Sequence, residues 1–307
     1  MKVYRKLNDP ELETVPRCVA IGIFDGVHKG HRRILEKVVS EAKKKKMRSM
    51  VVTFEPHPGK VLYPQKKAHP VILSLEHRLR IFGEIGLEEA LVIGFNKKFS
   101  KISHNSFLNK FLLGRLGMRA LVVGYDFRFG RKGLGDSSFL RRESEKRGFD
   151  FEVVGPLRHG RTVISSTRIR HLIEKGDLKN ASKMLGRRVS LYGTVVPGRR
   201  RGRQIGFPTA NINPHHETLP PTGVYAVWGV LDGKRLKGAL HIGKRPTFGD
   251  GESAVEVHLL DFGKSIYGKD LELLFVSKLR PTRHFKSPKE LTAAIRRDVL
   301  SVTRNLK

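Results

Sequence analysis

The stretch GIFDGVHKGH, at residues 22–31, lies between an apolar run and an amphipathic segment. Residues 19–24 are apolar enough for a buried strand, and residues 31–42 place their apolar side chains on one face of a helix. In open parallel sheets, ligands bind at such turns, where a strand ends and a helix begins. The stretch therefore predicts an α/β domain with a phosphate-binding turn.

The same alternation continues on the C-terminal side of this turn. Short apolar runs separated by amphipathic helices are typical of a parallel sheet that is covered on both faces. The expected further strands are residues 50–54, 90–93, 120–123 and 151–154, and the expected further helices follow Ser74 and Ser103.

The pattern changes near residue 185. A short helix over residues 178–185 is followed by apolar runs that are separated by Gly, Pro and Asp turns, without helices between them. This pattern predicts an antiparallel β-barrel or sandwich, and a last helix begins after Ser287. The expected strands are residues 189–196, 223–231, 236–242, 254–260 and 271–279. We therefore expect two domains, residues 1–185 and 186–307.

The net charge of +31 is the most unusual global feature of the 307 residues. A field of this sign attracts polyanions, so one hypothesis is a basic protein that binds nucleic acid. The other is a solvated basic surface, with a few cations at phosphate sites. The sequence contains no zinc-finger spacing, RRM signature or heptad repeat, which favours the second hypothesis.

The apolar segments and the cysteine content of the sequence bear on where the protein is found in the cell. No apolar run reaches the roughly 20 residues of a membrane helix, and the first residues contain no apolar core of a secretory signal. Cys18 is the single cysteine, so an intrachain disulfide is excluded. These observations predict a cytoplasmic protein without a membrane span.

His28 and His31 give the first turn its chemistry. Glycines let the backbone approach a phosphate closely, and a helix N-terminus offers free N–H groups. Two histidines three residues apart can donate to phosphate oxygens as charge develops during adenylyl transfer. The alternatives are a zinc pair or a structural histidine; zinc would need further ligands, and Cys18 lies before the strand.

A second candidate phosphate segment is ISSTRIR, at residues 164–170. Hydroxyl groups in the first turn of a helix, followed by arginine, suit a triphosphate. The same residues are also an ordinary cluster of helix-capping side chains, so this segment alone leaves both interpretations open.

The second half contains a glycine-punctuated loop, GRQIGFPTAN, at residues 202–211. Thr209 and Asn211 offer neutral oxygen ligands of the kind that Mg²⁺ accepts when phosphates hold it. No Walker loop is present. Further along, Glu256 and His258 lie on one face of an alternating strand. This face of the strand is either simply exposed to solvent, or Glu256 on it is a general base for phosphoryl transfer.

The motifs at residues 22–31, 54–58, 124–130 and 165–170 occur together and in order. In this combination the chain resembles the bacterial bifunctional riboflavin kinase/FAD synthetases over essentially its whole length. The resemblance implies a Rossmann-like nucleotidylyltransferase domain and a six-stranded Greek-key barrel with a terminal helix. It also implies two Mg²⁺-dependent reactions with ATP: riboflavin to FMN, and FMN to FAD with release of pyrophosphate.

The resemblance assigns roles in the first domain. His28 and His31 would stabilise the transition state of adenylyl transfer. The residues implied around the nucleotide are Gly22, Phe24, Asp25 and Gly30 in the loop and Ser166, Thr167 and Arg168 at the triphosphate. Those implied around the flavin are Phe54, Pro56, His57, Pro58 and Asp126.

In the second domain the matching motifs are residues 208–211, 223–225, 242–247 and 256–262. Glu256 would be the base toward the riboflavin 5′-hydroxyl, and Thr209 and Asn211 would hold Mg²⁺. The implied ATP loop also includes Gly202, Gly206 and Pro208.

Three positions depart from the kinase pattern: His241 replaces the usual Asn, Thr282 the usual Glu and Ala294 the usual Gln. They concern flavin binding in the kinase site. They motivate the alternative that only the adenylyltransferase is active.

Overall fold

The computed structural model describes residues 1–65, 70–198, 202, 205–215, 218–244 and 253–307. Residues 203–204 of the glycine-punctuated loop and residues 245–247 of the kinase motif lie outside this description. The chain divides into two compact units, each described by itself below. The first is Met1–Val71 with Leu75–Ser166, and the second is Ile72–Ser74 with Thr167–Lys307.

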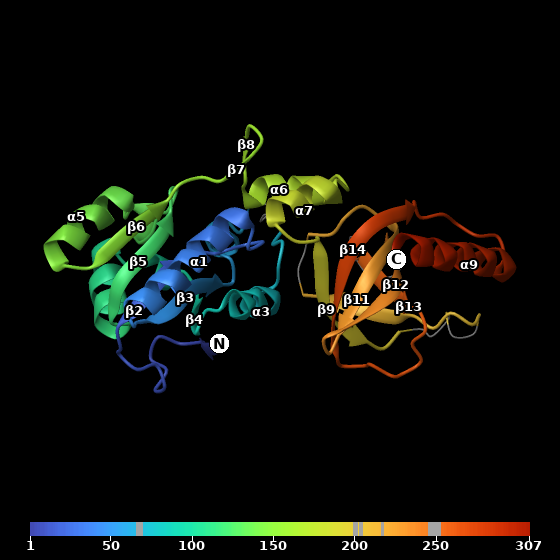
Figure 1. Ribbon diagram of the computed structural model, residues 1–307, viewed down its shortest axis with the longest axis horizontal. Coiled ribbons are helices and arrows are strands. Elements are labelled where there is room, and N and C mark those ends of the chain that lie inside the picture. The colour runs from blue at the N-terminus through green and yellow to red at the C-terminus, as the bar shows by residue number, and fades with distance from the viewer. Residues whose placement is uncertain (66–69, 199–201, 203–204, 216–217, 245–252) are drawn as a thin grey trace. The chain divides into compact units, whose positions relative to one another are not determined.

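The first unit contains a parallel six-stranded sheet in the order β1-β4-β3-β2-β5-β6 (Figure 1). The strands are β1 (Lys2–Tyr4), β2 (Arg17–Ile21), β3 (Arg48–Glu55), β4 (Glu89–Gly94), β5 (Met118–Gly124) and β6 (Asp150–Val154). The strand order reverses at β2, which pairs with β3 on one side and β5 on the other. The predicted α/β fold is confirmed, and β1 is a strand that the sequence pattern did not indicate.

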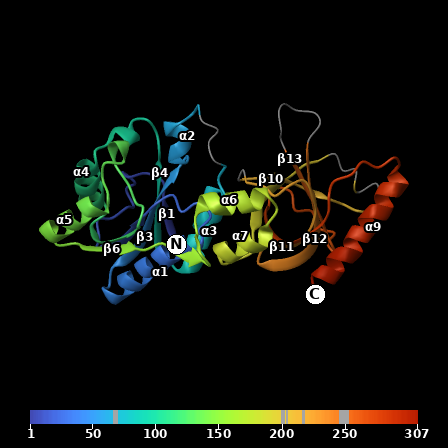
Figure 2. The same ribbon diagram turned by 90° about the horizontal axis from the view of Figure 1, so that it is seen from above.

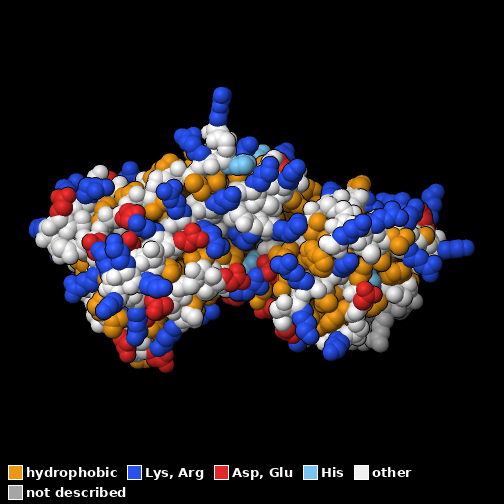
Figure 3. Space-filling model, viewed as in Figure 1, with side chains coloured by type: hydrophobic (Ala, Val, Ile, Leu, Met, Phe, Trp, Pro, Cys, Tyr) orange, Lys and Arg blue, Asp and Glu red, His pale blue; other side chains and the backbone are white. Residues whose placement is uncertain are grey.

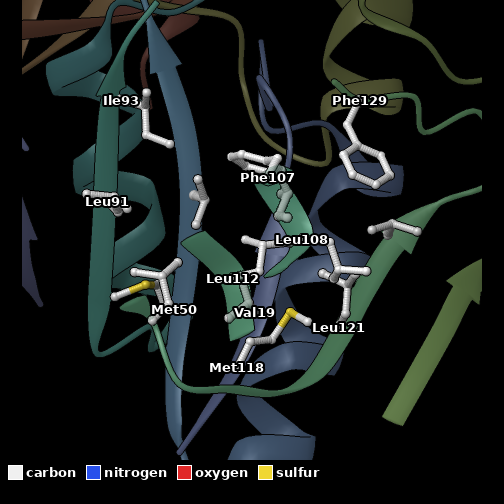
Figure 4. Packing of buried hydrophobic residues seen from close by; sticks show 14 of the residues in the cluster. Val19, Met50, Leu91, Ile93, Phe107, Leu108, Leu112, Met118, Leu121 and Phe129 are labelled. Atoms are coloured by element: carbon white, nitrogen blue, oxygen red, sulfur yellow. The ribbon is translucent and has the colours of Figure 1, made fainter. Parts of the chain in front are cut away.

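Helices cover both faces of this sheet (Figure 2). Its helical elements are α1 (Lys29–Lys44), α2 (Pro58–Leu62), α3 (Leu75–Ile85), η1 (Phe99–Lys101), α4 (His104–Ser106), η2 (Phe107–Arg115), η3 (Arg131–Gly133) and α5 (Ser137–Arg147). The element η2 is a π-helix where a regular helix was expected. It packs Leu108 and Leu112 onto Val19, Met50 and Leu91 of the sheet (Figure 4).

The second unit is built on a closed antiparallel barrel in the order β10-β13-β12-β11-β14-β9. Its strands are β9 (Ser190–Val196), β10 (Ala210–Pro214), β11 (Gly223–Leu231), β12 (Lys234–Lys244), β13 (Ser253–Leu259) and β14 (Asp270–Arg280). Of the two predicted alternatives the barrel is correct, with six strands. The helices α6 (Ser166–Glu174) and α7 (Leu178–Leu185) precede it, and α9 (Pro288–Asn305) follows it. Val302 of α9 packs against Ala226 and Trp228.

Lysine and arginine side chains are spread over the visible face and gather over α9 (Figure 3). Lys289, Arg296 and Arg297 line a shallow hollow on that helix. Among the residues that the structure describes, no helix is both long and apolar enough to cross a membrane.

A buried ion pair joins two strands of the parallel sheet. Arg17 on β2 is fully buried, and its Nε donates to Glu89 Oε2 on β4 at 2.5 Å. A second nitrogen of Arg17 donates to the Leu116 carbonyl at 2.7 Å. The Tyr4 hydroxyl also donates to Glu89, at 3.3 Å. Arg48, which is more exposed, also donates to Glu89, at 3.1 Å, so Arg17 is the fully buried partner of this carboxylate.

We expect Arg17→Met to lower the free energy of unfolding of the first unit by about 3–5 kcal/mol, because Glu89 keeps a buried charge without this partner. Urea unfolding followed by circular dichroism measures this change. The single tryptophan, Trp228, lies in the barrel, so its fluorescence reports the second unit separately.

The matched control for this variant is Arg32→Met. Arg32 forms an exposed ion pair with Glu36 at 2.7 Å, and its loss should cost at most about 0.5 kcal/mol. Equal effects of the two substitutions would contradict a stabilising role for the buried pair.

Candidate functional site

The GIFDGVHKGH turn follows β2 directly, at the point where the strand order reverses. The predicted strand over residues 19–24 is too long, because β2 ends at Ile21. Phe24 and Val27 then adopt φ values of 53° and 39°, and Gly26 has φ 80°. Left-handed backbone at a β-branched residue is a strained conformation of the kind found at functional sites. The backbone is therefore bent sharply between β2 and α1.

His28 caps the helix that begins at this turn. Its Nδ1 accepts the backbone N–H of His31 at 3.2 Å. In the neutral imidazole the proton must then be on Nε2, which can donate to a ligand. A Cβ at Gly30 would lie only 3.2 Å from the His28 ring, so the glycine leaves room for this ring. His28 is thus oriented by the helix that it caps.

The ring of His31 stacks on that of His28, with 3.6 Å between the ring centroids. Its Nδ1 is buried and has no hydrogen-bond partner among the described residues. Burial, and secondarily the neighbouring His28, lower the pKa of His31 well below its ordinary value. His31 is therefore neutral at pH 7.

Phe24 completes the packing of the turn. Its ring contacts His31 edge-on at 5.4 Å and Phe82 of α3 at 6.0 Å. A Cβ at Gly22 would lie 3.2 Å from this ring. The interior of the turn is thus filled by an aromatic side chain that only a glycine at residue 22 accommodates easily.

The SSTRIR segment begins α6. The Ser166 hydroxyl donates to the Asp25 carbonyl at 2.7 Å, so two of the predicted nucleotide segments meet in the first unit. Thr167 and Arg168 follow in the first turn of α6, both exposed. Asp25 itself is buried, with 4% of its surface exposed.

The predicted flavin residues lie where β3 ends. Phe54 contacts Phe95 and Phe99, with centroid distances of 5.9 and 6.1 Å. His57 caps the short helix α2, since its Nδ1 accepts the Gly59 N–H at 3.0 Å. Pro58 is the first residue of that helix, and Pro56 precedes the cap. This segment presents an aromatic ring beside a fixed proline-rich turn.

An aromatic cluster connects this segment with the loop after β5. Phe107 of the π-helix lies 5.9 Å from Phe99 and 6.0 Å from Phe129. Phe129 stacks on Phe127 at 5.5 Å. Asp126 precedes these residues and is exposed. The motifs at residues 54–58 and 124–130, distant in sequence, are therefore joined through phenylalanine contacts.

In the barrel, the glycine-punctuated loop folds back on itself. The Phe207 N–H donates to the Gly202 carbonyl at 2.8 Å, and a Cβ at Gly202 would collide with the Phe207 carbonyl. Gly206 has φ 80°, which glycine adopts without strain. His258 Nδ1 lies 2.8 Å from the Pro208 carbonyl. The loop is therefore fixed against the strand that contains Glu256.

Asn211, Glu256 and His241 form a row across three strands. The register pairs Asn211 of β10 with Glu256 of β13, and Glu256 with His241 of β12. Directly opposite residues have their Cβ atoms about 5 Å apart and share one face. Glu256 is half-buried, while its neighbours Val255 and Val257 point into the barrel core. The predicted base and the predicted Mg²⁺ ligand thus lie side by side.

The three departures from the kinase pattern have different surroundings. Burial lowers the pKa of His241, while Glu256 acts in the opposite direction, so His241 is neutral at pH 7. Thr282 is exposed, and Ala294 is buried in α9. Only His241 lies in the row with Glu256.

The structure adds two features that the motifs did not indicate. Gly198 lies against Asn211, since a Cβ at residue 198 would overlap the Asn211 side chain. A pocket of about 360 Å³ adjoins Thr209, a size typical of small-molecule sites. Its lining includes Val257, Leu259 and the loop of residues 262–267. A glycine after a strand and an apolar loop are weak signals in a sequence, which is why both were missed.

The zinc alternative receives no support within the described part of the chain, where no group of three or more His, Cys, Asp or Glu side chains could hold a metal ion. Thr209 and Asn211 are neutral oxygen donors. Such donors suit Mg²⁺ that phosphates hold, rather than a metal held by protein alone.

Each unit thus has its own candidate nucleotide site, and together they define a two-domain transferase that uses nucleotides. Comparison with known proteins makes this class specific. The FAD synthetase family model matches residues 11–168, and the riboflavin kinase family model matches residues 185–306. The chain belongs to the family of bifunctional riboflavin kinase/FMN adenylyltransferases.

Relatives with that name match nearly full length. The Pseudomonas fluorescens protein is 37% identical over 92% of this chain and 91% of its own. The Escherichia coli K12 protein is 36% identical over 98% and 96%, and the Bacillus subtilis protein 33% over 93% and 91%. A solved structure described as a macrolide-efflux protein from Streptococcus pneumoniae has a TM-score of 0.84 and 29% identity, covering 100% of both chains.

We expect an ATP analogue to raise the pKa of His31, because phosphate favours the charged imidazole that burial disfavours. In the free protein His31 should titrate well below its ordinary value of 6.5. NMR titration of the histidine Cε1–H signals measures both states. A signal of His31 that titrates identically with and without the analogue would contradict phosphate binding here.

We also expect Gly198→Ala to reduce riboflavin phosphorylation at least tenfold, about 1.4 kcal/mol in the barrier, since the new methyl group displaces Asn211. Gly155→Ala is the control, because a Cβ at Gly155 meets nothing within 4 Å. Conversion of riboflavin to FMN measures the change. An unaltered rate in the Gly198 variant would show that Asn211 is not needed where it lies.

Proposed function

We propose that this chain phosphorylates riboflavin in the barrel and adenylylates FMN in the Rossmann-like domain. The observation that carries the proposal is that each unit has its own candidate site. One is the stacked His28–His31 pair at the start of α1, and the other is the Asn211–Glu256 pair. The family to which the chain belongs carries out both reactions.

In the adenylyltransferase, the FMN phosphate attacks the α-phosphorus of ATP and pyrophosphate leaves. His28 donates from Nε2, and the ring of His31 stacks on it, so the pair stabilises charge on the phosphate oxygens. Gly22, Phe24, Asp25 and Gly30 shape the loop. Ser166, whose hydroxyl donates to Asp25 in the first unit, would hold the triphosphate further, and the resemblance implies the same role for Thr167 and Arg168.

The flavin of FMN lies beside the segment that follows β3. The aromatic face of Phe54 suits a planar ring system, and Pro56, His57 and Pro58 form a turn whose shape the cap on Gly59 maintains. Asp126 is exposed on the loop after β5, where it can meet the flavin or the ribose.

In the kinase, Glu256 takes the proton of the riboflavin 5′-hydroxyl, the oxygen attacks the γ-phosphorus of ATP, and ADP leaves. Thr209 and Asn211 would hold Mg²⁺, and the ion would supply positive charge beside the phosphates. Gly202, Gly206 and Pro208 bring the backbone close to those phosphates. The pocket beside Thr209 is large enough for the adenine of the same ATP.

The compact units divide between Ser166 and Thr167, and we propose that the boundary between the two catalytic domains lies further along the chain, at residues 185–186. It is supported by the end of α7 at Leu185, where Gly186 has φ 80° and ends the helix. The riboflavin kinase family model also begins at residue 185. A cytoplasmic location is consistent with the single cysteine, Cys18, which is buried and free.

We expect His28→Ala to abolish FAD formation from added FMN while leaving riboflavin phosphorylation intact, and Glu256→Ala to do the reverse. The reason is that each residue belongs to a different unit. Each protein is incubated with ATP and Mg²⁺ and with either riboflavin or FMN, and the flavins are separated by chromatography.

The same assay on the unaltered chain tests the alternative raised by His241, Thr282 and Ala294. FMN formed from riboflavin rules out a protein that is only an adenylyltransferase. Loss of both activities in either variant, with the fold intact, would contradict two independent sites.

A further inference from the structure

Arg78 on α3 is a buried cation that none of the motifs includes. Only 3% of its side chain is exposed. Arginine stays protonated in proteins, so a buried guanidinium needs partners that compensate its charge. These partners come from the turn that follows β2 and from the last residues of the neighbouring strand β3.

One nitrogen of Arg78 is bound to the GIFDGVHKGH turn. It donates to the Ile23 carbonyl at 2.7 Å and to the Thr53 hydroxyl at 3.0 Å. Thr53 donates to the same carbonyl at 3.1 Å. Ile23 immediately precedes Phe24, where the backbone enters the left-handed region. Arg78 therefore holds the backbone at the point where the turn bends.

The other terminal nitrogen is bound to the flavin-side segment. It donates to Glu55 Oε2 at 2.7 Å, and Glu55 is directly followed by Pro56, His57 and Pro58. A planar guanidinium with a fixed fork of donors sets both the distance and the angle between its acceptors. One side chain thus links the turn after β2 with the last residue of β3.

Phe82, one helical turn after Arg78, gives a second contact between α3 and the turn. Its ring lies 6.0 Å from that of Phe24. Burial lowers the pKa of Arg78, and the Glu55 carboxylate acts in the opposite direction. The contacts, rather than solvent, therefore keep this cation in place.

We propose that Arg78 is a positioning residue of the adenylyltransferase, which fixes the GIFDGVHKGH turn relative to the predicted flavin segment at residues 54–58 through Ile23 and Glu55. The inference rests on the proposed adenylylation of FMN. The attacking and leaving groups in this reaction must be aligned across the turn and this segment. A displacement of about 1 Å at such a site can cost on the order of 100-fold in rate.

The test uses the full-length protein and measures FAD formation from FMN and ATP, with KM for each substrate. Arg78→Lys keeps the charge but cannot donate in two directions from one plane. We expect it to lower kcat by about 10- to 100-fold, with riboflavin phosphorylation unchanged. Arg80→Lys is the control on the same helix, since Arg80 forms a half-exposed pair with Glu84 at 3.3 Å.

Glu55→Ala separates positioning from stability. This side chain is 44% exposed, so the variant should fold, and it removes only the arm toward the flavin segment. We expect KM for FMN to rise about tenfold, as for a tenfold weaker binding of FMN. KM for ATP should stay the same. A purely structural Arg78 would not produce this difference between substrates.

The outcomes are distinct. If the unaltered protein forms no FAD from FMN, the proposed function fails. If it forms FAD and both Arg78→Lys and Glu55→Ala keep its kinetic constants, the proposal about Arg78 is wrong. If Arg78→Lys does not fold, Glu55→Ala decides: a selective rise in KM for FMN supports the proposal, and an unchanged KM overturns it.

Discussion

The parallel pairing of β2 with β3 on one side and β5 on the other is the constraint on which the first site depends. The three strands run in one direction, so their carboxyl ends meet at one edge of the sheet. The chain leaves β2 toward one neighbour and reaches the other only after β4, which opens a crevice at that edge. His28 and Asp126 lie in the loops after β2 and β5, and Phe54 lies near the end of β3. Their proximity follows from strand order before any side chain contributes.

Most helices and strands were predictable from the sequence. A helix or strand that is buried on one face or on both has a characteristic pattern of apolar residues within its own segment. The elements that were missed depend on distant partners. The strand β10 is a short segment ending at Pro214, and it becomes a strand because β9 and β13 supply both neighbours and close the barrel. The π-helix has the apolar residues of an ordinary helix. We attribute its winding to the packing of Phe107, Leu108 and Leu112, which meet the sheet and the aromatic cluster together.

The residues of the candidate sites also fall into those that the sequence predicted and those that it did not. His28 and Glu256 were identified because they stand in motifs whose spacing is local. Gly198 and Arg78 were not, because their roles arise from contacts across the fold: Gly198 leaves room for the side chain of residue 211, and Arg78 joins residues 23 and 55. Arg78 is far from residues 23 and 55 in the sequence, much further than the repeat of a helix or a strand. Such residues have no local signal, and a buried arginine in an amphipathic helix is the one hint that sequence offers.

The high positive charge is largely separate from the chemistry of these sites. The groups closest to the expected phosphates include the neutral imidazole of His31 and the uncharged side chains of Thr209 and Asn211. A buried cation would have to lose its hydration before a ligand arrives, whereas a neutral donor that is already oriented loses much less. Arg168 is exposed at the start of α6, so its charge can act at the edge of a site without this cost. The surface charge then attracts anionic substrates over a distance, whereas the oriented groups at the turn stabilise the charge that develops during the reaction.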